Sequence, residues 1–267
     1  MRRLFTPRST DRDAAAVAVT TPGQGEFGDI AVFYDHLMSS VSYRSWVDYV
    51  EAILDRRVAR PQRVLDLCCG TGKVGAEMLR RGHSVVGADL SEPMVRRCGL
   101  QTRPLPAAVQ DACELGFQPG SMDLVVCLFD SLNYITKPER LAACFREVYE
   151  VLAPRGLFVF DLNTRRALSI GLFNQSSLTA NDPLVYSWEA HWDPATRLCR
   201  VDMWFQWRGD HQPHEVRETH WQYAYETHEV LAMLGAAGFV SITPYDAYTF
   251  HPPHRKSDRL YYVARKE

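Results

Sequence analysis

Hydrophobic residues follow two different patterns along the first 163 residues of the chain. Five short apolar runs have the length of buried strands, and they span residues 64–67, 85–89, 105–109, 122–128 and 157–161. In the segments 73–81 and 138–152, apolar residues instead recur every three or four positions, which indicates helices with one buried face. Strands that alternate with helices predict an α/β protein with a doubly wound, mainly parallel sheet, whose ligands bind at the carboxyl ends of the strands.

The segment before the first strand divides into a tail and a helical part. Residues 1–25 are charged, small and interrupted by glycine and proline, so we expect a flexible tail there. Residues 26–60 carry apolar side chains at helical spacing in two stretches, around Phe33 and around Val50. We expect these two helices to form an N-terminal helical cover on the core.

The pattern changes beyond Asn163. Three aromatic-rich runs alternate apolar and polar positions, which indicates antiparallel strands, and they span residues 184–192, 197–207 and 216–225. We expect them to form an antiparallel β insertion within residues 164–225. Residues 226–267 then return to one helix and two strands, which complete a seven-stranded core together with residues 61–163.

Composition narrows the class of partner. The chain has 267 residues, of which 46% are hydrophobic, and this is enough to build a sizeable core. Its formal net charge of −2 gives no general attraction to nucleic acid or to an acidic membrane surface. No apolar run approaches the roughly 20 residues needed to cross a bilayer. The expected partner is therefore a small molecule.

The cysteines and histidines bear on redox compartment and on metals. Seven cysteines are an odd number, and Cys68 and Cys69 lie in a glycine-rich loop while Cys127 lies in a predicted core strand. This usage indicates reduced thiols and a cytoplasmic location. The cysteines lack paired metal-binding spacing, and the histidines at positions 211, 214, 251 and 254 lie in proline-rich loops. We expect no metal site.

The first predicted strand runs into a glycine-rich loop. Its Gly70-x-Gly72-x-x-Gly75 spacing fits the dinucleotide-binding fingerprint, in which backbone N–H groups at a helix N-terminus face the ligand. This spacing is compatible with NAD(P) and with S-adenosyl-L-methionine (SAM). Asp66 favours SAM, because a carboxylate at the end of this strand repels a pyrophosphate but attracts an ammonium group.

Two further acids follow along the chain. Asp89 ends the second predicted strand about twenty residues past the glycines, where an acid can accept both ribose hydroxyls. Asp111 precedes the strand at 122–128. Three successive strand ends therefore present Asp66, Asp89 and Asp111, one each for a methionine moiety, a ribose and an adenine amine.

These residues together carry a family resemblance. The ordered set Asp66–Gly72, Asp89–Met94, Gln110–Ala112 and Phe129–Tyr134 resembles the class I SAM-dependent methyltransferases, in particular those of bacteria that act on small molecules. The resemblance implies a Rossmann-like methyltransferase fold, with SAM as cofactor and S-adenosyl-L-homocysteine as product. It also implies a set of cofactor-binding residues: Asp66, Cys68, Gly70, Thr71, Gly72, Asp89, Leu90, Met94, Gln110, Asp111, Ala112, Phe129 and Tyr34.

The candidate catalytic residues are Asp130, Tyr34 and His220. Methyl transfer from a sulfonium is an in-line displacement, so the acceptor must present a lone pair, and an amine must first lose a proton. Asp130 could accept a hydrogen bond from the acceptor, or it could simply cap a turn. His220 could serve as a base, or it could be a hydrogen-bonded structural residue. The ring of Tyr34 could attract the sulfonium by a cation–π contact.

Several residues are candidates for the acceptor site, namely Tyr43, Trp46, Asn133, Tyr134, Trp188 and Trp221. The aromatic members could line the site, or they could pack helices onto the sheet. For the tryptophans of the insertion, an alternative role is a hydrophobic surface through which two copies of the chain form a homodimer.

The expected activity is methyl transfer to a small molecule. An amine nitrogen is slightly favoured as the acceptor, because acidic and aromatic residues surround the predicted mouth of the site. O-methylation of a hydroxyl or carboxyl group is the next alternative. An NAD(P)-dependent oxidoreductase shares the glycines and Asp89 but is disfavoured by Asp66. A further alternative is a protein that binds SAM without turnover.

Overall fold

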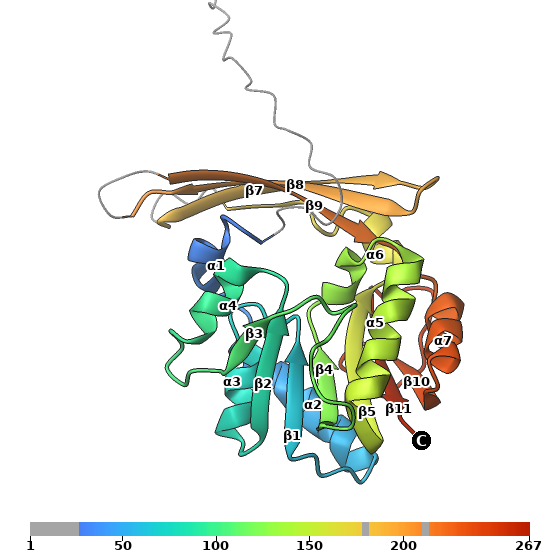
Figure 1. Ribbon diagram of the computed structural model, residues 1–267. Coiled ribbons are helices and arrows are strands. Elements are labelled where there is room, and N and C mark those ends of the chain that lie inside the picture. The colour runs from blue at the N-terminus through green and yellow to red at the C-terminus, as the bar shows by residue number, and fades with distance from the viewer. Residues whose placement is uncertain (1–26, 178–181, 210–213) are drawn as a thin grey trace, which may run out of the picture.

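The computed structural model describes residues 27–177, 182–209 and 214–267, so the tail predicted for residues 1–25 lies outside the described residues, as does His211. Its centre is a seven-stranded sheet of order β10-β11-β5-β4-β1-β2-β3 (Figure 1). The strands are β1 Arg63–Leu67, β2 Ser84–Asp89, β3 Ala107–Val109, β4 Met122–Cys127, β5 Leu152–Asn163, β10 Val240–Asp246 and β11 Arg259–Arg265. Only β11 runs antiparallel to its neighbours in this sheet. The predicted mainly parallel, seven-stranded α/β fold is confirmed.

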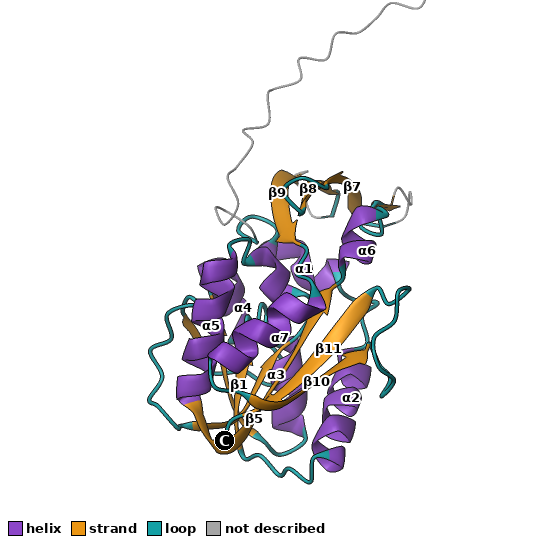
Figure 2. Cartoon of the chain, turned by 90° about the vertical axis from the view of Figure 1, so that its right-hand side faces the viewer, coloured by secondary structure: helices purple, strands orange, loops and turns teal. Residues whose placement is uncertain are grey.

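Helices cover both faces of this sheet (Figure 2). On one face, α5 (Pro138–Val151) and α7 (Thr227–Ala236) bury side chains such as Phe145 against the strands. On the other face, α2 (Tyr43–Arg56) and α3 (Lys73–Arg80) do the same, while α4 (Glu92–Cys98) packs beside β2 and β3. Each face of the sheet therefore carries its own cluster of buried apolar side chains, as expected for central strands that are covered on both sides.

The third strand is shorter than the predicted run of residues 105–109. It begins at Ala107, because Pro106 lacks the N–H that a strand residue donates to its neighbour. The carbonyl of Pro106 still accepts a hydrogen bond from Gly87 N at 2.7 Å, so the chain stays attached to β2.

The chain between β5 and α7 forms a separate antiparallel sheet of order β6-β7-β8-β9, as expected for the insertion. Its elements are β6 Gln175–Ser177, β7 Leu184–Asp193, β8 Leu198–Trp207 and β9 His214–Tyr223, and α6 (Arg165–Ser169) leads into them. The sequence did not predict β6, because Gln-Ser-Ser has no apolar alternation. The apolar face of this sheet packs on α1 (Ala31–Leu37), with Phe205 and Val216 in the same cluster as Phe33. The sheet therefore lies over the carboxyl ends of the parallel strands (Figure 1).

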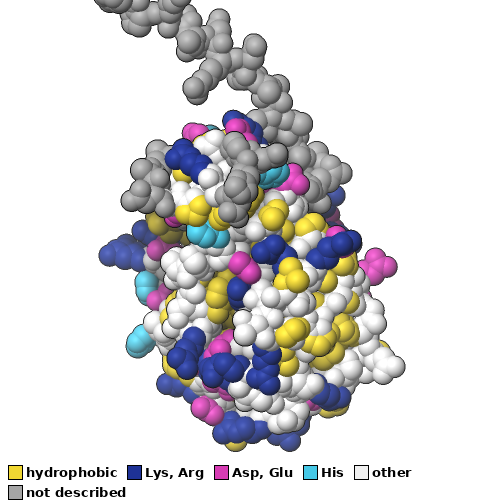
Figure 3. Space-filling model, turned by 90° about the vertical axis from the view of Figure 1, so that its left-hand side faces the viewer, with side chains coloured by type: hydrophobic (Ala, Val, Ile, Leu, Met, Phe, Trp, Pro, Cys, Tyr) yellow, Lys and Arg dark blue, Asp and Glu magenta, His cyan; other side chains and the backbone are white. Residues whose placement is uncertain are grey.

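Among the described residues, no helix is long and apolar enough to span a membrane. All seven cysteines are free thiols. On the side of the molecule that carries α3 and α4, basic side chains are interspersed with acidic and apolar ones (Figure 3). Glu77 of α3 forms ion pairs with Arg80 and Arg81, three and four positions along the same helix.

Candidate active site

A cavity of about 830 Å³ lies between the rim of the seven-stranded sheet and the inner face of the insertion. Its floor comes from the segments that follow β1, β2 and β4, and its roof includes Trp188 and Met203 of the insertion. Residues of the N-terminal part, among them Tyr34, Tyr43 and Trp46, close one side. The cavity is thus assembled from segments far apart in the sequence, and its size suits a cofactor together with a small acceptor.

The glycine loop joins β1 to α3 at the floor of the cavity. Gly72 begins α3 with φ of 80°, a left-handed conformation that favours glycine. A side chain at Gly75 would place its Cβ 2.7 Å from Leu105 Cδ2 and 3.0 Å from Asp66 Oδ2, so a larger residue there would displace Leu105. Gly75 N donates a hydrogen bond of 2.8 Å to Asp66 Oδ2. Burial raises the pKa of Asp66 to about 7, and this hydrogen bond opposes the rise.

Asp89 holds the next section of the floor together. One carboxylate oxygen accepts from Gly70 N and the other from Ser91 N, each at 2.8 Å. Burial raises the pKa of Asp89, while these backbone N–H groups act to lower it. Ser91 in turn caps α4 by accepting from Met94 N at 3.4 Å. The carboxylate therefore fixes the position of the glycine loop and lines the cavity at the same time.

Gln110, Asp111 and Ala112 line the same cavity beyond β3. Asp111 forms an ion pair with Arg140 and accepts a hydrogen bond of 2.8 Å from Cys113 N. Its side chain is 34% exposed, so it is less enclosed than Asp66. All but one of the predicted cofactor-binding residues line the cavity, including Cys68, Thr71, Leu90 and Phe129. The exception is Gly72, which turns the chain into α3.

Aromatic rings form the walls on the other side of the cavity. Tyr34 is half-buried, and burial raises its pKa well above the ordinary value, so its hydroxyl stays protonated. The rings of Trp46 and Phe129 lie 4.7 Å apart between centroids. Phe27 packs against Tyr134 at 5.1 Å, which places this residue at the same wall. The indole Nε1 of Trp188 is buried and has no hydrogen-bond partner among the described residues.

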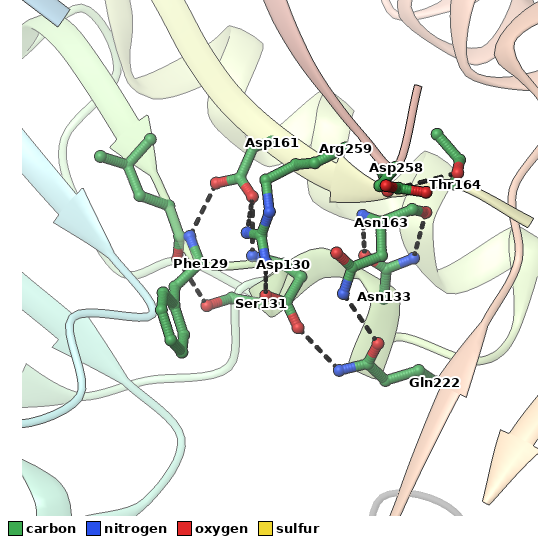
Figure 4. A network of polar contacts seen from close by, with 11 residues as sticks. Phe129, Asp130, Ser131, Asn133, Asp161, Asn163, Thr164, Gln222, Asp258 and Arg259 are labelled. Carbon is green, nitrogen blue, oxygen red and sulfur yellow. Dashed lines mark hydrogen bonds and ion pairs between the residues drawn. The ribbon is translucent and has the colours of Figure 1, made fainter. Parts of the chain in front are cut away.

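Asp130 belongs to a polar network beneath this wall (Figure 4). Arg259 Nη2 donates to Asp130 Oδ1 at 2.6 Å, and Gln222 Nε2 donates to Asp130 Oδ2 at 2.7 Å. The same guanidinium pairs with Asp161, whose carboxylate also accepts from Phe129 N at 2.7 Å. Burial raises the pKa of Asp130 and Arg259 opposes the rise. Both oxygens of Asp130 thus have protein partners.

Two predicted acceptor-site residues lie elsewhere. Asn133 is fully buried: its amide donates to the carbonyls of Asn163 and Tyr223, and its oxygen accepts from Asn163 N at 2.9 Å. These bonds join the 3-10 helix η1 (Ser131–Tyr134) to β5 and β9 instead of facing the cavity. Trp221 is opposite Arg200 on the outer face of the insertion, because alternation along β9 points it away from its neighbour His220.

His220 lies at the enclosed end of the cavity with no solvent-exposed surface. Its Nε2 is 2.7 Å from Glu218 Oε2. Its Nδ1 is 3.4 Å from the hydroxyl of Tyr134, a residue of the cavity wall. Since an ionised carboxylate can only accept, the arrangement places the imidazole proton on Nε2 and leaves Nδ1 as an acceptor.

Sequence reasoning missed four residues of this region: Arg259, Asp161, Gln222 and Phe27. Arg259 and Gln222 line the cavity from β11 and β9, which are separated from the glycine loop by more than a hundred positions. Asp161 gave one usable signal, because it is an acid within a predicted hydrophobic strand.

Comparison with known proteins gives the family. The family model "Methyltransferase domain" matches residues 64–156. The Bacillus subtilis protein named "Putative methyltransferase YqeM" is 30% identical over 240 residues, and the match covers 88% of this chain and 95% of that protein. A solved SAM-dependent methyltransferase from Clostridium acetobutylicum aligns with a TM-score of 0.76 at 23% identity, over 88% of this chain and 96% of that one. The chain belongs to the class I SAM-dependent methyltransferases.

A second solved structure shares the fold of this methyltransferase. The sugar N-methyltransferase KedS8 from Streptoalloteichus aligns with a TM-score of 0.76 at 18% identity, over 94% of this chain and 98% of that one. The family membership settles the cofactor as SAM and the activity as methyl transfer, so the NAD(P) alternative is dropped. The floor of the cavity suits SAM chemically, because it presents the carboxylates of Asp66, Asp89 and Asp111, and carboxylates can accept hydrogen bonds from ammonium, hydroxyl and amine groups.

Proposed function

We propose that this methyltransferase transfers a methyl group to an amine nitrogen of a small molecule, with His220 as the proton acceptor. The observation that carries the proposal is the enclosed imidazole next to the predicted cofactor floor, whose Nδ1 is left as an acceptor 3.4 Å from the hydroxyl of Tyr134 in the wall of an aromatic cavity. In this assignment Asp66 meets the ammonium of SAM, Asp89 its ribose and Asp111 its adenine amine. Tyr34, Tyr43, Trp46 and Trp188 surround the acceptor.

The acceptor end of the cavity is the part next to His220, Gln222 and Arg259. The charged groups there support an amine as the methyl acceptor. The carboxylates of Asp130, Asp161 and Glu218 lie in this region, and Arg259 pairs with the first two. Three acidic side chains against one guanidinium make this part of the cavity richer in acidic than in basic groups. A surplus of acidic groups there attracts an ammonium and disfavours a carboxylate acceptor.

The residues then have separable parts in the reaction. When bound, SAM supplies an electrophilic methyl group on a sulfonium. The acceptor ammonium gives one proton to Nδ1 of His220, which frees the nitrogen lone pair for attack. The aromatic walls exclude water and hold the nitrogen in line with the methyl group, a positioning effect that reaches roughly 7–11 kcal/mol in the best intramolecular cases. Asp130, with both oxygens engaged, acts in this scheme by holding Gln222 and Arg259 in place.

A hydroxyl acceptor is the second candidate, and the indole of Trp188 favours it. Its buried Nε1 lacks a partner among the described residues, so an oxygen of the acceptor would satisfy this donor. The same imidazole could take a hydroxyl proton. The two candidates therefore differ in the atom that is methylated and share the base.

The test is turnover of SAM with paired panels of apolar-bodied amines and alcohols, with products identified by mass spectrometry. Methylated amines support the proposal, methylation of alcohols alone shifts the activity to oxygen, and no turnover across both panels contradicts it. His220→Gln should lower kcat about 100-fold with SAM affinity within threefold of wild type. His191→Gln is the matched control, because His191 lies on the exposed face of the same sheet and should leave kcat unchanged.

A further inference from the structure

Glu218 takes part in three hydrogen bonds, two of them from the backbone of the N-terminal segment. Its Oε2 binds His220 Nε2 at 2.7 Å and also accepts from Phe27 N at 3.1 Å. Its Oε1 accepts from Ile30 N at 2.9 Å. The carboxylate is 8% exposed and belongs to β9, whereas Phe27 and Ile30 lie almost two hundred positions earlier. One side chain therefore binds both the proposed base and the backbone that precedes α1.

The same N-terminal backbone is also attached to the cofactor floor. Ser91 Oγ donates to the carbonyl of Phe27 at 2.7 Å. Ser91 N donates to Asp89, and Asp89 accepts from Gly70 N, as described above. The peptide groups of Phe27 thus connect the floor, through Ser91, to the acceptor end, through Glu218.

The ring of Phe27 completes this arrangement. Its centroid lies 4.5 Å from that of His220, 5.1 Å from that of Tyr134 and 6.0 Å from that of Tyr34. The ring therefore packs against both the imidazole and the aromatic wall of the cavity. Removing the anchor at Glu218 would release this ring and free the imidazole to rotate in one step.

We propose that Glu218 is a positioning residue that couples closure of residues 27–30 over the cofactor to the orientation of His220. The inference rests on the proposed role of His220 in methyl transfer. Its carboxylate fixes the imidazole with the proton on Nε2, as an acid hydrogen-bonded to a histidine fixes the tautomer. The backbone N–H groups of Phe27 and Ile30 occupy two more of its lone-pair sites and keep it an acceptor. His220 is then correctly oriented only when the segment is closed.

The first measurement needs no methyl acceptor. Long-range ¹H–¹⁵N spectra of the full-length protein, assigned with His220→Gln, should show the proton of His220 on Nε2. Glu218→Gln, which keeps the shape but adds a donor, should remove this preference, and the amide protons of Phe27 and Ile30 should exchange at least tenfold faster. A wild-type His220 that carries its proton on Nδ1 overturns the proposal even if no variant folds.

The second measurement is a double-mutant cycle of Glu218 and His220, in which kcat is measured with the acceptor that the panels identify. Glu218→Gln should lower kcat by about 100-fold, the range of a general base, and adding it to His220→Gln should lower kcat no further. Independent, multiplicative losses would overturn the proposal, because Glu218 would then act without His220. Glu189→Gln, an exposed acid on β7 of the same insertion, is the matched control and should have wild-type kcat. If the wild type methylates nothing, the proposed function fails, whereas the tautomer and exchange measurements still decide the role of Glu218.

Discussion

The two ends of the cavity are built in different ways. The cofactor floor comes from short segments that each follow a strand of one parallel sheet, and its acids bind backbone N–H groups close by in the chain. The acceptor end joins β9, β11, η1 and the N-terminal segment, and its acids accept hydrogen bonds from Gln222, Arg259 and the backbone of Ile30, which lie about ninety to one hundred and ninety positions away in the chain. A floor of this kind is fixed by local geometry, whereas the acceptor end depends on the whole fold being in place.

The largest expected effect comes from removing the guanidinium at the centre of the acceptor end. Arg259→Met leaves Asp130 and Asp161 buried and unpaired, and breaking a buried ion pair in this way typically costs about 3–5 kcal/mol of folding free energy. Denaturant unfolding should show this loss. Arg166→Met is the control, because its pair with Asp258 is largely exposed and should contribute no more than about 1 kcal/mol. Equal losses of folding free energy in the two variants would show that the buried ion pairs of Arg259 stabilise the fold no more than the exposed pair of Arg166.

This contrast also explains what the sequence could predict. Asp66 and Asp89 were found because each ends a hydrophobic strand, and parallel strands bring such ends to one edge. Arg259 has no comparable signal, since only the antiparallel pairing of β11 with β5 brings it to Asp161 and Asp130. Asn133 was predicted for the acceptor site because it is a polar residue that follows a strand. In the structure η1 turns it inward, where it binds backbone groups.

An intermediate effect is expected on the floor. Asp89→Ala should weaken SAM binding by about 1.5–3 kcal/mol, roughly 10- to 150-fold, because a charged acceptor for ribose is lost, while the fold is retained. Asp111→Ala should weaken it less than tenfold, since that carboxylate is partly exposed and already paired with Arg140. Calorimetric titration with SAM measures both. A larger effect at Asp111 would reverse the assignment of the two acids.

The smallest effect is a dependence of SAM affinity on pH. Burial raises the pKa of Asp66 to about 7, so in the free protein this acid is mostly protonated below that pH. Binding an ammonium requires the ionised form, so affinity should fall about tenfold for each pH unit below 7. Asp66→Asn should bind more weakly, and its affinity should not vary over pH 5.5–7. A wild-type affinity that is constant over this range would show that Asp66 does not meet the ammonium.

The central claim is that the floor binds SAM and the acceptor end does not. Calorimetric titration of SAM into Asp89→Ala and His220→Gln, side by side at one pH, tests it most directly. We predict a loss of at least tenfold in affinity for the first variant and a change of less than threefold for the second. A wild-type affinity in Asp89→Ala, or an equal loss in His220→Gln, would contradict the account.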